Sequence, residues 1–421
     1  MVIVDTILTG LNEVVTLEQG PIPRRGKDLE ELTRVDRGAI GLREGKVAWV
    51  GRSSELDRAV RLRKGGTRRE FSGGIAVPGF VDAHTHLVFA GDRSPEAGRK
   101  VRGESYLEIA RRGGGLFSTV TATRMASEAA LFREARARLE GMVSWGTTSL
   151  EVKSGYGLDL DSELRILQVI RRLGRSAGAT VVPTFLGAHA IPPEFSGRSS
   201  AYVRDLLRRQ IPVVARQGIA RFCDVFCEAG FFSAGESRTI LKAGQRAGLG
   251  AKIHAEEFSH SGGIRVAADV GAVSADHLLC ANAADIELMA RRGVTAVLLP
   301  TTPWASMSPA RSPGREMADA GVAVALGSDF SPNSWEDSMP LVLAHAVYSA
   351  HLTPAEALTA ATVNAAYAIG LPGAGRIVPG GRADIAVFDL PSPEHLGYRL
   401  SPPKPLEVFL GGRPVSHPAA S

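Results

Sequence analysis

Hydrophobic residues between about residue 74 and residue 330 gather in short runs that alternate with amphipathic stretches. The runs are rich in β-branched residues, as strands are. The stretches between them, such as DLDSELRILQVIRRLG and AADIELMARRG, place apolar residues three and four positions apart, as helices do. Several of these stretches end at glycine, which helix C-caps prefer. The pattern therefore predicts βα units around a parallel sheet.

Eight strand-like runs occur in this part of the chain: IAVPGFVDA, TTSLEV, TVVPTFLGA, FCDVFCE, AKIHAEE, AVSADH, TAVLLP and VAVALGSDF. Eight βα units are the number that closes a TIM barrel. No close internal sequence repeat is visible, which argues against a solenoid. We therefore predict the α/β class, with a (β/α)8 TIM-like barrel over residues 74–370.

The two ends of the chain show a different pattern. Residues 1–73 and 371–421 contain apolar runs broken by glycine and proline, which is typical of β structure. Because neither end is long enough for a stable β domain alone, we expect both to form one small discontinuous β-sandwich domain beside the barrel. Residues 91–146, the longest insertion after a predicted strand, are a candidate lid.

Composition and charge narrow the class of protein. The chain has 421 residues, 44% hydrophobic and 22% charged, as a soluble globular protein does. The formal net charge is +5, but arginine and glutamate are interleaved along the predicted helices, so we expect no nucleic-acid partner. No apolar run approaches the length of a membrane span, and the first residues do not resemble a signal peptide. We expect a cytoplasmic protein without a membrane partner and, by base rate, a homodimer.

The cysteines give no disulfide framework. Cys223, Cys227 and Cys280 are an odd and sparse set, which fits a reducing compartment. Cys223 and Cys227 lie four positions apart among apolar neighbours, so we interpret them as buried structural thiols rather than as a metal pair.

Polar side chains follow the predicted strands at their carboxyl ends. In chain order they are His84 and His86, Lys153 and Tyr156, His189, Glu228, His254, His277, Thr301 and Thr302, and Asp329. In a barrel these ends converge on one face, where the active sites of this fold are built. The sequence therefore predicts one site made from residues some 250 positions apart.

The segment PGFVDAHTHL carries the strongest local signal for chemistry. His84 and His86 alternate along a strand, so both imidazoles project to the same side and can bind one ion. With His254 in KIHAEEF, His277 in SADHL and Asp329 in LGSDFSPNS, the chain resembles the amidohydrolase superfamily.

The resemblance to the one-metal branch of that superfamily implies the ligands His84, His86, His254 and Asp329, with His277 close to a metal-bound water. Three neutral imidazoles and one carboxylate suit one divalent ion, zinc or iron, with a position left for water. A two-metal site needs a carboxylated lysine or a glutamate on an intermediate strand. Lys153 is on the wrong strand and Glu228 is a weak candidate, so one metal is favoured. For Lys153, a salt bridge with Glu151 or Glu228 and a substrate contact both stay open.

Longer strings resemble the imidazolonepropionase family within that superfamily. They are GDRSPE, RGESYLEIARRGGG, TSLEVKSGYGL, PTFLGAHAIPPEF, RFCDVFCEAGFFS and KIHAEEFSHSGG, and they span most of the predicted barrel. The resemblance implies hydrolysis of 4-imidazolone-5-propanoate to N-formimidoyl-L-glutamate in histidine degradation, by attack of metal-bound hydroxide on the ring carbonyl.

The same resemblance implies roles for single residues. Arg93 and Tyr156 would bind the propionate and the ring, and His189 the ring. Glu257 would activate water and return its proton, His277 would polarise the carbonyl, and Asp329 would share the proton transfer. A guanidinium suits a carboxylate because its planar fork binds both oxygens.

Two segments depart from the family pattern. After Asp329 the family usually reads close to D-F-N-P-G-T or D-F-N-P-G-S, whereas this chain has Ser331, Asn333 and Ser334 at the variable positions. We predict that these three side chains contact the substrate, with Ser331 and Asn333 in place of the usual asparagine and glycine. The segment LLPTTPWASM also differs from the commoner pattern of the family, which is compatible with a different substrate.

Two other functions stay open. One is another mononuclear amidohydrolase, a deaminase or cyclic amidase that acts on a different heterocycle; Arg93 argues against it, because a neutral heterocycle requires no buried guanidinium. The other is a non-catalytic barrel scaffold, against which the presence of every predicted ligand argues.

Overall fold

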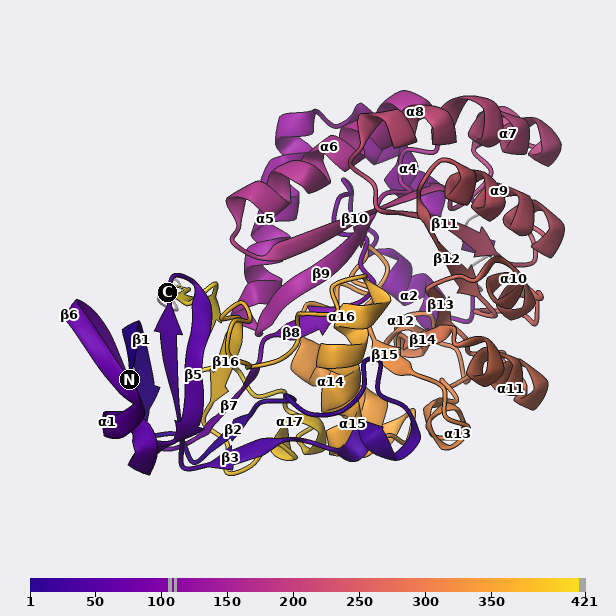
Figure 1. The fold of residues 1–421 in the computed structure, drawn as a ribbon. Coiled ribbons are helices and arrows are strands. Elements are labelled where there is room, and N and C mark those ends of the chain that lie inside the picture. Colours follow the sequence, from indigo (N-terminus) through magenta and orange to yellow (C-terminus); the bar gives the residue numbers. More distant parts are fainter. Residues whose placement is uncertain (105–107, 110–111, 416–421) are drawn as a thin grey trace.

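A computed structural model describes residues 1–104, 108–109 and 112–415. Its centre is a parallel sheet of eight strands that are hydrogen-bonded in chain order (Figure 1). The strands are β8 (Phe80–Asp82), β9 (Thr147–Lys153), β10 (Thr180–Ala188), β11 (Phe222–Cys227), β12 (Gly250–Ala255), β13 (Ser274–His277), β14 (Thr295–Leu298) and β15 (Val324–Leu326). Each lies at one of the eight predicted runs.

Hydrogen bonds between the first and the last of these strands close the cylinder. The amide of Ala83 donates to the carbonyl of Leu326 at 3.2 Å, and the amide of Asp329 donates to the carbonyl of His84 at 3.0 Å. The predicted TIM-like barrel is therefore confirmed.

Helices follow the barrel strands and pack around the barrel (Figure 1). They are α5 (Glu128–Ser144), α6 (Leu160–Ser176), α7 (Ser199–Asp205), α8 (Ile211–Gln217), α9 (Ala234–Arg246), α10 (Gly263–Val270), α11 (Ala283–Arg292), α13 (Gly314–Asp319), α14 (Met339–Tyr348), α15 (Pro354–Thr359) and α16 (Ala365–Ala368). Local chemistry sets their ends. The Asp159 side chain accepts a hydrogen bond from the amide of Ser162 at the start of α6, and Gly293, with φ of 72°, ends α11.

Both chain ends build two small sheets beside the barrel (Figure 1). The first sheet has the order β5 (Lys46–Arg52), β4 (Gly38–Arg43), β1 (Val2–Thr9), β6 (Val60–Glu70). The second has the order β18 (Arg413–Pro414), β17 (Glu407–Leu410), β16 (Ile385–Phe388), β7 (Ile75–Pro78), β2 (Glu13–Val15), β3 (Arg34–Asp36). Leu8 and Ile40 of the first sheet share one apolar cluster with Ile385 and Phe409 of the second, so the predicted sandwich is present.

The predicted first barrel strand, IAVPGFVDA, is in fact two strands in two sheets. Residues Ile75–Pro78 pair with β16 and β2 of the sandwich, and the barrel strand begins at Phe80. Pro78 has no amide hydrogen, and Gly79 passes so close to the Thr148 side chain that a Cβ would lie 2.2 Å from it. The chain changes sheets at this Pro-Gly pair. The exact limits of the two domains stay a prediction.

The insertion after β8 contains α2 (Glu96–Val101), α4 (Leu116–Met125) and α5. Within RGESYLEIARRGGG, residues 105–107 and 110–111 lie outside the described part of the chain. The ammonium of Lys100 at the end of α2 donates to the carbonyl of Ala305 at 2.9 Å and to Oδ1 of Asn333 at 2.6 Å, which ties α2 to the loops after β14 and β15. A lid movement of this segment stays a prediction. Among the described helices, none combines the length and the apolar character that a membrane crossing requires.

Candidate active site

A pocket at the carboxyl ends of the barrel strands contains most of the predicted site residues. Its lining consists of His86, Arg93, Leu116, Tyr156, His189, Phe226, His254, Glu257, Phe258, His277, Asp329, Ser331 and Asn333. His84 is fully buried beside His86, and the hydroxyl of Ser334 donates to the carbonyl of Asp329 at 2.6 Å. The barrel therefore brings together side chains from seven of its strands or from the segments that follow them.

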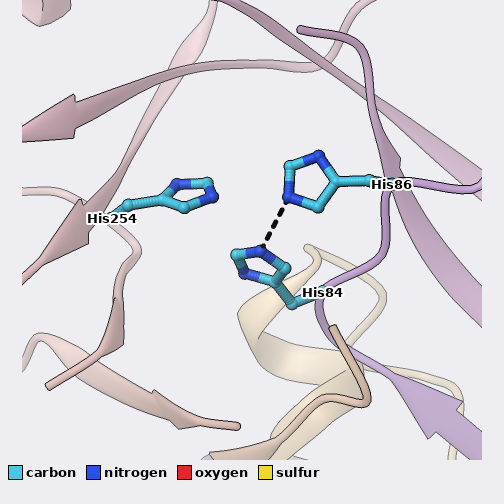
Figure 2. A group of neighbouring side chains, drawn as sticks. All are labelled: His84, His86 and His254. Carbon is cyan, nitrogen blue, oxygen red and sulfur yellow. Dashed lines mark hydrogen bonds between the residues drawn. The ribbon is translucent and has the colours of Figure 1, made fainter. Parts of the chain in front are cut away.

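Three imidazoles converge at the base of this pocket (Figure 2). The Nε2 atoms of His84 and His86 lie 3.3 Å apart, and the ligand atoms of these two and His254 all lie within 4.8 Å of one another. Oδ1 of Asp329 lies 3.7 Å from Nε2 of His84 and 3.8 Å from Nε2 of His86. Ligand atoms about 2.0–2.2 Å from one ion lie roughly 3–4 Å from each other, so the spacing fits a single metal ion.

Neighbouring carboxylates fix which ring nitrogen faces the ion. Nδ1 of His84 donates to Asp276 at 2.7 Å, and Nδ1 of His254 lies 3.1 Å from Asp224. An ionised carboxylate only accepts hydrogen bonds, so each Nδ1 carries the hydrogen and each Nε2 presents a lone pair. Nε2 of His254 is buried and has no hydrogen-bond partner among the described residues. A buried nitrogen lone pair without a hydrogen-bond partner, beside three other potential ligand atoms, fits a bound divalent cation.

The electrostatics of the site also favour ligation. Burial, Lys153 and the neighbouring imidazoles hold the pKa values of His84 and His254 well below the usual range, so both rings are neutral, as metal ligands must be. Burial raises the pKa of Asp329 to about 7, and a hydrogen bond from Thr302 to Oδ2 at 3.1 Å opposes the rise.

Glu257 and His277 form a second pair on the pocket wall. Oε2 of Glu257 lies 3.6 Å from Nε2 of His277. Burial, with the charges of Asp329 and Glu228, raises the pKa of Glu257 well above its ordinary value, whereas burial lowers the pKa of His277 to about 3. A carboxyl group with a raised pKa can take up and return a proton near neutral pH, while a neutral imidazole can donate a hydrogen bond.

Aromatic rings line the pocket beside the imidazole cluster. The ring of Tyr156 lies 5.5 Å from that of His189 and 5.7 Å from that of His86, measured between centroids. Nδ1 of His189 donates to the carbonyl of Gly155 at 3.0 Å. Gly155 has φ of 106°, and a Cβ there would lie 2.9 Å from that nitrogen, so the close approach requires glycine. Glu163 holds this loop by accepting the amide of Gly157 at 2.8 Å.

The pocket wall also carries positive charge. Arg93 is buried, and its guanidinium donates to Glu96 at 2.9 and 3.0 Å and to Oδ1 of Asn333 at 3.3 Å. Asn333 also accepts from Lys100, so two cations meet at one amide. Because Arg93 lines the pocket, its guanidinium can interact with a carboxylate that enters there.

Sequence analysis did not single out the supporting carboxylates. The sequence does carry a signal for Asp224 in FCDVFC and Asp276 in SADH, because each is an acidic residue within a strand predicted to be buried. Such a residue requires a partner inside the protein. Of the two alternative partners considered for Lys153, Glu151 forms the salt bridge, at 2.8 Å, whereas Glu228 accepts the amide of Phe258 at 2.9 Å.

The cysteines agree with their structural interpretation. Cys223 and Cys227 are free and buried, and neither belongs to a possible metal cluster within the described ranges.

The fold and the site define a metal-dependent hydrolase, and the model of the amidohydrolase family matches residues 75–415. The imidazolonepropionase of Symbiobacterium thermophilum is 43% identical to this chain over 97% of each, and that of Myxococcus xanthus is 42% identical over 98% of this chain and 97% of its own length. The chain belongs to the amidohydrolase family and, within it, to the imidazolonepropionases.

A solved structure of an adenosine deaminase from Xanthomonas campestris with bound zinc superposes with a TM-score of 0.70 at 16% identity, covering 98% of this chain and 93% of the other. At that identity the likeness concerns the fold alone.

Proposed function

We propose that this protein hydrolyses 4-imidazolone-5-propanoate to N-formimidoyl-L-glutamate. The observation that carries the proposal is that one pocket is lined by three of the four potential metal ligands, the Glu257 carboxyl and the Arg93 guanidinium, with the fourth ligand, His84, buried beside them. The relatives, similar over nearly the whole chain, support it because they carry the name of this activity. A deaminase of a neutral heterocycle would not need Arg93, and a scaffold would not need the ligands.

We propose that His84, His86, His254 and Asp329 hold one divalent ion, zinc or iron. Three imidazoles and a carboxylate suit either metal. A second group of possible ligands, His84, Glu151 and Asp276, already has an ammonium in it, because Nζ of Lys153 lies 2.8 Å from Glu151 and 3.2 Å from Asp276. This pairing supports a single ion. When bound, such an ion supplies a water of lowered pKa and polarises a carbonyl oxygen.

The protein's own residues would then move the proton and stabilise the developing charge. Glu257 takes a proton from the attacking water and delivers it to the departing ring nitrogen, as the carbon–oxygen bond forms and the carbon–nitrogen bond breaks. His277, 3.6 Å from that carboxyl, hydrogen-bonds the carbonyl oxygen, and Asp329 can share the proton.

Substrate orientation follows from the pocket walls. Arg93 binds the propionate, and Tyr156 and His189 contact the imidazolone ring. Ser331 and Asn333 line the pocket and Ser334 lies beside Asp329, so we assign these three to the remaining polar edge of the substrate.

The test is a hydrolysis assay that follows the loss of imidazolone absorbance with purified enzyme. Imidazolonepropanoate should be turned over, whereas an imidazolone without the propionate should react with a much higher KM. Failure on imidazolonepropanoate, together with turnover of another heterocycle, overturns the substrate assignment and leaves the hydrolase class.

We further propose that the enzyme works in the cytoplasm as a homodimer without nucleic acid. Base rates support the dimer, and the interleaved charges of the helices support the lack of a nucleic-acid partner. Light scattering of the purified protein would give the mass of the assembly.

A further inference from the structure

A second cluster of ionisable side chains lies inside the barrel beneath the imidazoles. It consists of Glu151 and Lys153 on β9, Asp224 on β11, Lys252 on β12 and Asp276 on β13. Each of the five is 0% exposed. Lysine, aspartate and glutamate side chains are almost never fully buried unless they are paired with an opposite charge. The contacts within the cluster must therefore explain why these side chains are buried.

Lys153 lies at the centre of these contacts. Its Nζ is 2.8 Å from Glu151, 2.7 Å from Asp224 and 3.2 Å from Asp276. An ammonium has three hydrogens to donate, which matches the three carboxylates.

Two of these carboxylates also hold predicted metal ligands. Oδ2 of Asp276, which contacts Lys153, is the atom that accepts from Nδ1 of His84 at 2.7 Å. Oδ2 of Asp224, which also contacts Lys153, lies 3.1 Å from Nδ1 of His254. One ammonium thus connects two histidines that come from opposite parts of the barrel sequence.

The charge balance explains why the connection matters. Two cations and three carboxylates leave the cluster with one net negative charge. Without Lys153, the carboxylates of Asp224 and Asp276 would lie in a desolvated interior without the ammonium that both of them contact, and neither would be held at its position. The histidine beside each carboxylate would then lose the fixed acceptor that sets its tautomer and its ring orientation.

We infer that Lys153 is a positioning residue of the metal centre, which holds the carboxylates of Asp224 and Asp276 in place so that His254 and His84 present Nε2 to the same ion. The inference rests on the proposed function, because it uses the proposed ligands.

Lys252 provides a matched control within the same cluster. It is equally buried, and its Nζ pairs with Glu151 at 2.9 Å and lies 3.5 Å from the carbonyl of Ala83 and 3.4 Å from that of Ala368. Neither it nor Glu151 contacts a histidine in the hydrogen bonds of the described residues. Lys252→Met and Lys153→Met therefore remove the same charge from the same cluster, but only the second removes the link to the ligands.

The experiment compares the metal affinity of the full-length native protein, Lys153→Met and Lys252→Met by competition with a chelator, using Zn²⁺ as the probe. Lys153→Met should weaken binding by about 10- to 100-fold, the usual effect of losing an outer-shell partner. It should also shift the visible spectrum of the Co²⁺-loaded protein. Lys252→Met should lower the thermal stability of the apoprotein but leave the affinity and the spectrum close to native.

Equal losses of affinity in both variants, or no loss in Lys153→Met, would overturn the inference in favour of a purely structural role. If Lys153→Met does not fold, Asp276→Asn replaces it, because removing one carboxylate leaves the cluster neutral. Asp276→Asn should weaken Zn²⁺ binding by a similar factor, and unchanged affinity would contradict the inference. Failure of the native protein to bind one Zn²⁺ would instead refute the proposed metal site.

Discussion

The interior of the β-sandwich and the interior of the barrel are built on different principles. Between the sandwich sheets, Val14, Ile40, Ile385 and Phe409 belong to one cluster of buried apolar side chains. Burial of such side chains stabilises a fold at about 25 cal/mol per Å². The barrel interior instead contains a fully buried network of lysines and carboxylates, whose desolvation opposes folding. The comparison teaches that the two fully buried lysines among the described residues, Lys153 and Lys252, both lie in the barrel interior beneath the proposed metal ligands.

The largest effect on activity should come from removing a metal ligand. We expect His254→Ala to lose the bound ion and to lower kcat by roughly 10⁴-fold, comparable with the loss of one member of a catalytic triad. Metal analysis and steady-state kinetics on one sample measure both. His345→Ala is the control, since His345 packs against Trp304 outside the pocket and should keep metal and activity. Native metal content and turnover in His254→Ala would remove His254 from the ligand set.

Loss of the proposed proton carrier should come next. Glu257→Gln should lower kcat by about 10²- to 10⁴-fold with little change in metal content or KM. The neighbouring Glu256 is a suitable control because it accepts the amides of Gly263 and Ile264 at the start of α10. Glu256→Gln should lower stability and leave kcat near native. Similar kcat values for Glu257→Gln and the native enzyme would contradict the role.

Substrate binding should be affected more moderately. Arg93→Ala should raise KM by about 10- to 100-fold, the range expected for loss of a hydrogen bond to a charged group. Kinetics with imidazolonepropanoate measure this change. Arg99→Ala, which removes a partner of Glu104 outside the pocket, should leave KM unchanged. A loss confined to kcat in Arg93→Ala would point to a role in the chemical step instead.

A substitution in the core of the sandwich should have the smallest effect on activity. Phe409→Ala should lower the free energy of unfolding by about 3–5 kcal/mol, because it leaves a cavity in the apolar cluster. Since Phe409 is outside the pocket, kcat and KM at a temperature where the variant is folded should match the native values. Denaturant unfolding and kinetics test both parts. A large fall in kcat would show that the sandwich acts on the barrel rim.

Much of the barrel could be predicted from sequence because hydrophobic periodicity and strand-end polarity are local signals. His84 and Asp329 follow recognisable strands and His254 lies near the end of another, and the closure of the barrel makes them neighbours. The change of sheet at Gly79 could not be predicted, because it depends on the contact with Thr148, which is distant in sequence. The pairing of Lys153 with Asp224 and Asp276 was equally hidden, since it depends on which strand faces which across the barrel.

Titration of the apoprotein with Zn²⁺ or Fe²⁺ tests the central claim most directly, with kcat on imidazolonepropanoate followed at each addition. Activity should rise from background in proportion to the added metal and level off at one ion per chain. A plateau at two ions per chain, or full activity in the metal-free protein, would contradict a single-ion centre formed by His84, His86, His254 and Asp329.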